Sequence, residues 1–141
     1  MKIVNFAVMA VALFATNSMV SVYAVNQQLN SATKLFSVKL GATRVIYHGS
    51  HSGFRVWSDE QKAGNTPTVL LLSGQQDPRH HIQVRLEGEG WQPDTVSGRG
   101  AILRTAADNA SFSVVVDGNQ EVPADTWTLD FKACALAQED T

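Results

Sequence analysis

Two alternating stretches late in the chain decide the fold: Ala110–Asp117 reads ASFSVVVD, and Thr126–Lys132 reads TWTLDFK. In the second stretch Trp127, Leu129 and Phe131 share one face, and the residues between them are polar or charged. A repeat of two with one apolar face is typical of half-buried antiparallel strands. The segment that joins the two stretches contains Gly, Asn and Pro, which favour turns. We therefore predict two neighbouring strands of an antiparallel sheet.

The sandwich that these strands suggest is one strand short. An immunoglobulin-type sandwich ends with a strand that returns across its last sheet. After Ala133 only Cys134 to Thr141 follow, and the end of this segment is polar and acidic. The sequence therefore predicts an immunoglobulin-like sandwich without its last strand.

The rest of the chain also predicts strands. Phe36, Val38 and Leu40 are expected on one face of a first strand, and a turn at Gly41 and Ala42 is expected to end it. No segment has an apolar stripe of helical period longer than about two turns, so the predicted class is all-β. Including this first strand, the strands predicted before Ala110 are residues 34–40, 43–47, 53–58, 68–72 and 80–87.

The first residues have the pattern of a secretory signal. Lys2 precedes an apolar run from Phe6 to Ala15, and a small residue, Ala24, ends the segment as a signal peptidase requires. A membrane anchor, the alternative, needs about 20 nearly continuous apolar residues, whereas polar residues interrupt this run from Thr16 on. We predict a signal peptide at residues 1–24 and one domain at residues 25–141.

The charge balance argues against a nucleic-acid partner. The whole chain has a formal net charge of −2, and removal of Lys2 with the signal makes it more negative. Nucleic acids and anionic membranes are bound through clustered positive charge, which this chain lacks. We therefore expect no nucleic-acid partner.

Four histidines raise the alternative of a secreted metal-binding protein or enzyme. His80 and His81 are adjacent in a predicted strand, so their side chains point to opposite faces. His48 and His51 flank a Gly-Ser turn without a third ligand nearby in the sequence. We favour solvent-exposed histidines over a metal site, and we find no catalytic set and expect no enzymatic activity or cofactor.

The three tryptophans and the single cysteine receive separate interpretations. Trp127 is expected in the core, and Trp91 is expected to pack a loop onto the sandwich. Trp57 faces away from Phe54 and Val56 along the strand, so it belongs either to the core or to an exposed binding surface, and we favour the core. Cys134 has no partner for an intramolecular disulfide, and we interpret it as a half-buried apolar residue.

Four ordered motifs carry a family resemblance: His51–Trp57, Asp77–Arg85, Gly88–Pro93 and Asp117–Gln120. With them the chain resembles the Afa/Dr invasin type of minor pilus subunit, found at the tips of chaperone–usher fimbriae of adherent Escherichia coli. The matches fall in order over most of the chain after the predicted signal.

The resemblance implies a domain completed by a strand from another protein. In this mode of β-augmentation, backbone hydrogen bonds give affinity and alternate side chains fill pockets. The implied partners are a periplasmic chaperone, an outer-membrane usher, a major pilin subunit that supplies the donor strand, and a host cell-surface receptor such as an integrin. The implied location is the fimbrial tip, reached through the periplasm, with a role in adhesion to and invasion of epithelial cells. The resemblance also implies a disulfide that this chain cannot form, because Tyr47 stands where the family has the partner of Cys134.

Three further expectations follow from alternation and length. We expect the chain to accept a donor strand but not to supply one, because Val25 and Leu29 are the only large apolar residues between the predicted cleavage site and Lys34. The alternative is that Lys34–Leu40 is itself a donor strand and that the sandwich of an internal subunit begins near Thr43. A complete, freestanding immunoglobulin-like binding module remains a third reading, and it requires stability without a partner. The residues expected to line the donor-strand groove are Phe36, Val38, Leu40, Trp127, Leu129 and Phe131.

Overall fold

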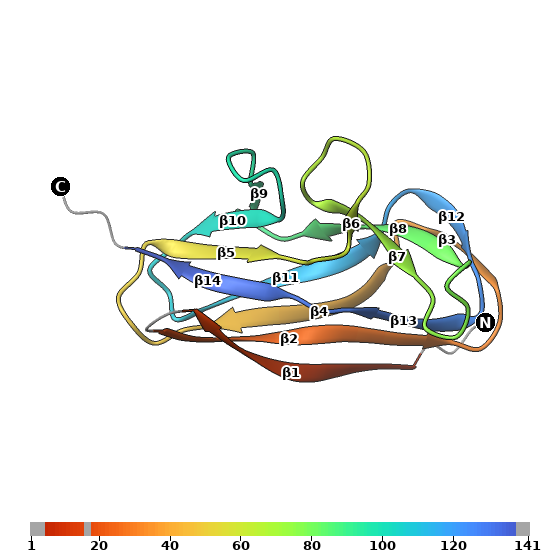
Figure 1. The fold of residues 1–141 in the computed structure, drawn as a ribbon, viewed down its shortest axis with the longest axis horizontal. Coiled ribbons are helices and arrows are strands. Elements are labelled where there is room, and N and C mark those ends of the chain that lie inside the picture. The colour runs from red at the N-terminus through yellow and green to blue at the C-terminus, as the bar shows by residue number, and fades with distance from the viewer. Residues whose placement is uncertain (1–4, 16–17, 138–141) are drawn as a thin grey trace.

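The computed structural model describes residues 5–15 and 18–137. Within these ranges the chain forms strands joined by turns and loops, as the all-β prediction requires. The described residues contain no helix that is long and apolar enough to cross a membrane. The strands form two layers that enclose a common core, together with a small third sheet near one end (Figure 1).

The larger layer is an antiparallel sheet in which strands distant in sequence are neighbours. Strand β13 (Asp125–Leu129) pairs with β2 and lies off the main path of the sheet. That path runs in the order β1 (Asn5–Ala15), β2 (Ser18–Leu29), β4 (Lys39–Ile46), β11 (Asn109–Val116), β8 (His81–Glu87), β7 (Val69–Ser73) and β6 (Gln61–Lys62).

The second layer has four antiparallel strands and the third sheet has two. In the second layer the order is β14 (Lys132–Leu136), β5 (Gly53–Trp57), β10 (Ala101–Arg104) and β9 (Gln92–Pro93). In the third sheet β3 (Thr33–Phe36) pairs with β12 (Asn119–Val122).

The core lies between the layers and is built by alternation. In β8 the apolar Ile82, Val84 and Leu86 are buried, and the residues between them are exposed or half-buried, as predicted. The ring of Phe112 meets the ring of Phe131 edge to face, at 5.0 Å between centroids. Such aromatic contacts add to the burial of apolar area that holds the two layers together.

The predicted strand from Lys34 to Leu40 is wrong in its detail. The chain forms two strands there, because Ser37 has a left-handed backbone (φ 49°) and separates β3 from β4. The predicted turn at Gly41 is also absent, and β4 continues through this residue. A left-handed residue changes the direction of a strand, so Phe36 and Leu40 no longer share a face.

The predicted strand from Thr126 to Lys132 is likewise divided. It becomes β13 and β14, and the chain passes between them from the larger sheet to the four-stranded sheet. The predicted face nevertheless holds, because Trp127, Leu129 and Phe131 are all buried.

The amino-terminal strands β1 and β2 form an antiparallel hairpin from Asn5↔Gln28 to Ala15↔Ser18. The predicted cleavage after Ala24 falls within β2 and stays a prediction, and residues 1–4 and 16–17 of the predicted signal lie outside the described residues. Val22 and Ala24 are fully buried. Cleavage would therefore remove two core side chains.

Two glycines with left-handed backbones provide a matched test of the fold. Gly100 (φ 79°) begins the return into β10, and a Cβ there would overlap the carbonyl oxygen of Val56. At Gly118 (φ 76°) a Cβ would meet nothing within 4 Å. We expect Gly118→Ala to lower the free energy of unfolding by about 1 kcal/mol, the cost of the backbone conformation alone. Gly100→Ala should cost clearly more in urea denaturation, and equal losses would contradict the assigned contact.

Candidate functional site

Strand β14 has one edge without a strand partner among the described residues. It pairs with β5 from Lys132↔Trp57 to Leu136↔Gly53 and ends the four-stranded sheet. The preceding strand β13 is instead covered by β2, from Asp125↔Leu29 to Leu129↔Val25. The unpaired edge of β14 is therefore the place where one more strand can add to the sandwich.

The first part of β2 lies beside this edge. It pairs with β4 at Ser21↔Ile46 and Val22↔Val45, and β2 also lies close to β14. Figure 1 shows β2 running below β4, β13 and β14. The residues before the predicted cleavage site thus occupy the space next to the unpaired edge.

The structure distributes the six predicted groove residues between the core and the surface. Leu40, Trp127, Leu129 and Phe131 are buried. Phe36 is 71% exposed and Val38 is 41% exposed, because the backbone turns at Ser37. Phe36 therefore does not share a surface with the buried four.

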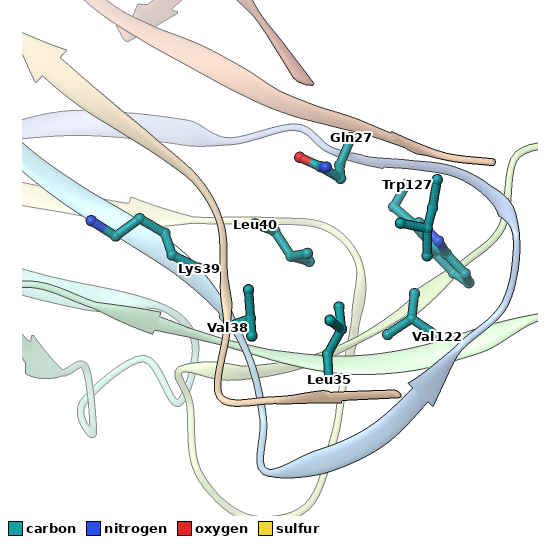
Figure 2. A pocket seen from close by; sticks show the side chains of 8 residues that line it. Gln27, Leu35, Val38, Lys39, Leu40, Val122 and Trp127 are labelled. Carbon is teal, nitrogen blue, oxygen red and sulfur yellow. The ribbon is translucent and has the colours of Figure 1, made fainter. Parts of the chain in front are cut away.

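Three of the six line one cavity of about 180 Å³ between the small sheet and strands β2 and β13 (Figure 2). These three are Val38, Leu40 and Trp127. Leu35, which the sequence analysis did not select, completes the wall from β3. The other lining residues are Gln27, Leu29, Lys39 and Val122.

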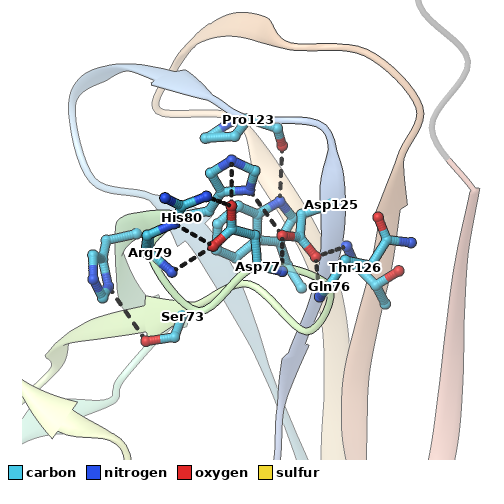
Figure 3. Close-up of polar contacts among 10 residues, drawn as sticks. Ser73, Gln76, Asp77, Arg79, His80, Pro123, Asp125 and Thr126 are labelled. Carbon is cyan, nitrogen blue, oxygen red and sulfur yellow. Dashed lines mark hydrogen bonds and ion pairs between the residues drawn. The ribbon is translucent and has the colours of Figure 1, made fainter.

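A buried carboxylate ties the start of β13 to the loop between β7 and β8. The side chain of Asp125 is fully buried and accepts hydrogen bonds from the backbone N–H groups of Gln76 (2.7 Å) and Asp77 (3.1 Å). His80 places its Nδ1 2.9 Å from the same carboxylate (Figure 3). Burial alone would raise the pKa of Asp125, but these hydrogen bonds outweigh it and hold the pKa below its usual value.

The outer face of the four-stranded sheet carries a cluster that the sequence analysis missed. The guanidinium of Arg55 lies 4.4 Å from the ring centroid of Trp57, and its Nε donates to Asp94 at 2.8 Å. Asp94 also accepts hydrogen bonds from Ser97 and from the backbone of Val96, so it orders the loop before β10. The core interpretation of Trp57 is thus wrong, since strand alternation buries Phe54 and leaves Trp57 half-exposed outside. No sequence signal linked Asp94 to Arg55, 39 residues away.

The other two tryptophans lie as predicted. Trp127 is 2% exposed. The indole of Trp91 donates to the backbone oxygen of Ser111 at 2.9 Å and meets the Phe112 ring edge to face. This contact fixes the loop after β8 against β11.

The histidines serve structural contacts. His51 is 3% exposed, so its predicted solvent exposure is wrong. Its two ring nitrogens lie 2.6 and 2.7 Å from the backbone oxygens of Gly49 and Ala107, which ties two loops together. His48 is exposed beside Asp108, as expected of a loop histidine. Residues 5–15 and 18–137 bring no three metal-ligating side chains together.

Tyr47 and Cys134 have different surroundings. Tyr47 packs against the core and meets the His51 ring edge to face at 5.4 Å. Cys134 is a free, half-buried cysteine opposite Arg55 in the β14–β5 pair, as the sequence interpretation expected. Burial raises the pKa of its thiol, and the neighbouring Arg55 offsets this only in part.

Comparison with known proteins identifies the family. Residues 31–133 match the model of the Enterobacteria AfaD invasin protein family. The chain belongs to this AfaD invasin family. Protein AfaD of Escherichia coli is 29% identical over 103 residues, which cover 72% of this chain and 69% of AfaD.

Solved structures of similar proteins agree with the AfaD assignment. The crystal structure of the Salmonella SafD adhesin is 70% identical with a TM-score of 0.73, and the match covers 95% of this chain and 84% of that one. HdaB, the minor tip subunit of the E. coli Hda pilus, is 23% identical with a TM-score of 0.69, covers 96% of this chain and 84% of its own, and shares the fold.

This AfaD-family chain is therefore a fimbrial subunit of the adhesin type with an incomplete immunoglobulin-like fold. The metal-binding or enzymatic alternative is the weaker reading, because the relatives are adhesin and pilus proteins and not known enzymes. Their fimbrial nature implies a place on a cell-surface pilus.

The Asp125 contacts predict an acid-sensitive stability. Because the folded pKa of Asp125 is depressed, its contribution is fully present above the ordinary aspartate pKa of about 4 and is lost as the pH falls through the folded value. We expect Asp125→Asn to lower the free energy of unfolding by about 1–3 kcal/mol at pH 6, with a smaller difference from wild type at pH 2.

Asp108→Asn is the matched control, since the Asp108 side chain is 57% exposed. Urea denaturation at the two pH values should show little change for it. If Asp125→Asn lowers the free energy of unfolding by the same amount at both pH values, the role of the ionised Asp125 carboxylate is refuted.

Proposed function

We propose that this chain is the tip subunit of a chaperone–usher fimbria and that it accepts a donor strand along the unpaired edge of β14. The proposal rests on the unpaired edge of β14, which pairs only with β5 among the described strands. An unpaired edge presents a row of backbone donors and acceptors to an incoming strand.

Processing at the predicted site would prepare the edge for its partner. Removal of residues 1–24 takes away β1 and the part of β2 that holds Val22 and Ala24. These two side chains are fully buried, so their loss uncovers apolar core next to β4 and β14. A donor strand with apolar side chains at alternate positions would cover this surface again.

Three strand pairings support the proposal that this chain accepts a donor strand but does not supply one. Thr33–Phe36 pairs with β12, and β4 pairs with β11, so the segment from Lys34 to Leu40 stays in its own domain. Val25 and Leu29 are buried against β13 and are not free to anchor in a neighbour. A subunit that only accepts a strand ends a fibre.

Each partner would be required at one step of assembly or adhesion. A periplasmic chaperone would protect the apolar edge before assembly, because such a surface promotes aggregation. An outer-membrane usher would deliver the subunit, a major pilin subunit would supply the donor strand, and a host cell-surface receptor such as an integrin would be bound at the tip. A freestanding module would need none of the first three.

We expect the processed chain, residues 25–141, to remain soluble in the periplasm only with its chaperone or with a donor strand fused to its carboxyl terminus. The fused strand should raise the melting temperature strongly, because it restores both the edge hydrogen bonds and the apolar cover. Thermal denaturation and soluble yield measure the effect.

The control is a fusion in which charged residues replace the alternate apolar residues of the donor sequence. Such a strand would place charges against the apolar core, so this fusion should not stabilise the domain. A processed chain that folds as a stable monomer alone would refute the proposal and favour the freestanding module.

A further inference from the structure

The strongest unexplained feature of the molecule is the carboxamide of Gln27. This side chain is 2% exposed, and neither its nitrogen nor its oxygen has a hydrogen-bond partner among the described residues. A buried amide without partners is costly, by about 1–3 kcal/mol in typical proteins. The Gln27 carboxamide therefore needs a hydrogen-bond partner that residues 5–15 and 18–137 do not provide.

Gln27 borders the cavity of about 180 Å³ described above. The walls around it are apolar side chains from five strands and the turn after β3, with Trp127 and Leu40 among the largest. Figure 2 shows Lys39 extending away from the other lining side chains, so its ammonium is not aimed at the amide. Gln27 is thus the single uncharged polar side chain among the lining residues.

Water satisfies such a site poorly. A buried water makes about three hydrogen bonds, and these walls offer the amide as their principal polar group. A molecule with an apolar body that fills the cavity and one polar atom would contact the apolar walls and also form a hydrogen bond with the Gln27 carboxamide. An apolar cavity of about 150 Å³ is known to hold one benzene ring, so this cavity has room for a ring with a small substituent.

We propose that this cavity is a binding site for a small uncharged molecule with an apolar body and one hydroxyl or amide group, which hydrogen-bonds to the Gln27 carboxamide. The carboxamide both donates and accepts, so a hydroxyl or amide suits it. Anions are disfavoured, because the walls would desolvate them without a buried cation. None of the lining residues belongs to β14, so the cavity does not lie at the unpaired edge.

The test compares benzyl alcohol with toluene on the isotopically labelled full-length chain, by two-dimensional NMR. We expect benzyl alcohol to shift the side-chain amide signal of Gln27 and the indole N–H signal of Trp127, without shifting that of Trp91. Benzyl alcohol should bind about fivefold more tightly than toluene, as one added hydrogen bond predicts, and benzoate should bind more weakly than benzyl alcohol.

Two neighbouring glutamines give a matched pair of variants. Gln27→Leu keeps the size of the side chain but removes its polar group, so the preference for benzyl alcohol over toluene should disappear. Gln28→Leu changes an exposed neighbour on the same strand and should leave the preference intact. If Gln27→Leu does not fold, the relative affinities of the wild type for benzyl alcohol and toluene still test the proposed site.

Three results would overturn the proposal: no binding of benzyl alcohol, equal affinity of the wild type for both compounds, or shifts located away from Gln27 and Trp127. Each of these results leaves the donor-strand proposal standing, because that proposal is tested with the processed chain and a fused strand.

Discussion

The burial of one apolar row organises this molecule. Trp127, Leu129 and Phe131 point into the core from a segment that passes from the larger sheet to the smaller one. Because this segment runs from β13 in one layer to β14 in the other, both layers must pack against Trp127, Leu129 and Phe131. The edge-to-face contact of Phe131 with Phe112 carries this constraint into the centre of the larger sheet.

This arrangement leaves β14 with one edge that has no strand partner among the described residues. The segment that serves both sheets needs strand partners along β13 and along β14, and β2 pairs only with β13. Along this edge of β14 the side chains of Cys134 and Leu136 are half-buried. An unpaired strand edge is a template for pairing with another chain, so this architecture suits a subunit built for assembly.

Polar contacts fix the loops around this apolar frame. Asp125 fastens the loop between β7 and β8 to the start of β13, and Asp94 fastens the loop before β10 to Arg55. Both carboxylates are buried and have depressed pKa values, because several donors converge on each despite its burial. Gln27 is the exception to this rule, since it is equally buried but its side chain has no hydrogen-bond partner in the described part of the chain. The contrast is what makes its cavity a candidate binding site.

The sequence by itself determined the all-β class, the inward face of Trp127, Leu129 and Phe131, and the alternation of β8. These features depend on the period of two, which is a local property of a strand. The position of Trp91 was also predictable, because a tryptophan in a glycine loop needs a surface to cover. The four ordered motifs also indicate the family without knowledge of the fold.

Only the tertiary structure decided which surfaces these strands share. The left-handed backbone at Ser37 separates Phe36 from Leu40, and nothing in the local pattern of apolar residues marks it. The pairs Arg55–Asp94 and His80–Asp125 join residues 39 and 45 positions apart. The cavity likewise is lined by residues as distant in sequence as Gln27 and Trp127. Alternation states which side of a strand is apolar, but the neighbours of that side are set by long-range pairing and packing, which a single sequence does not encode locally.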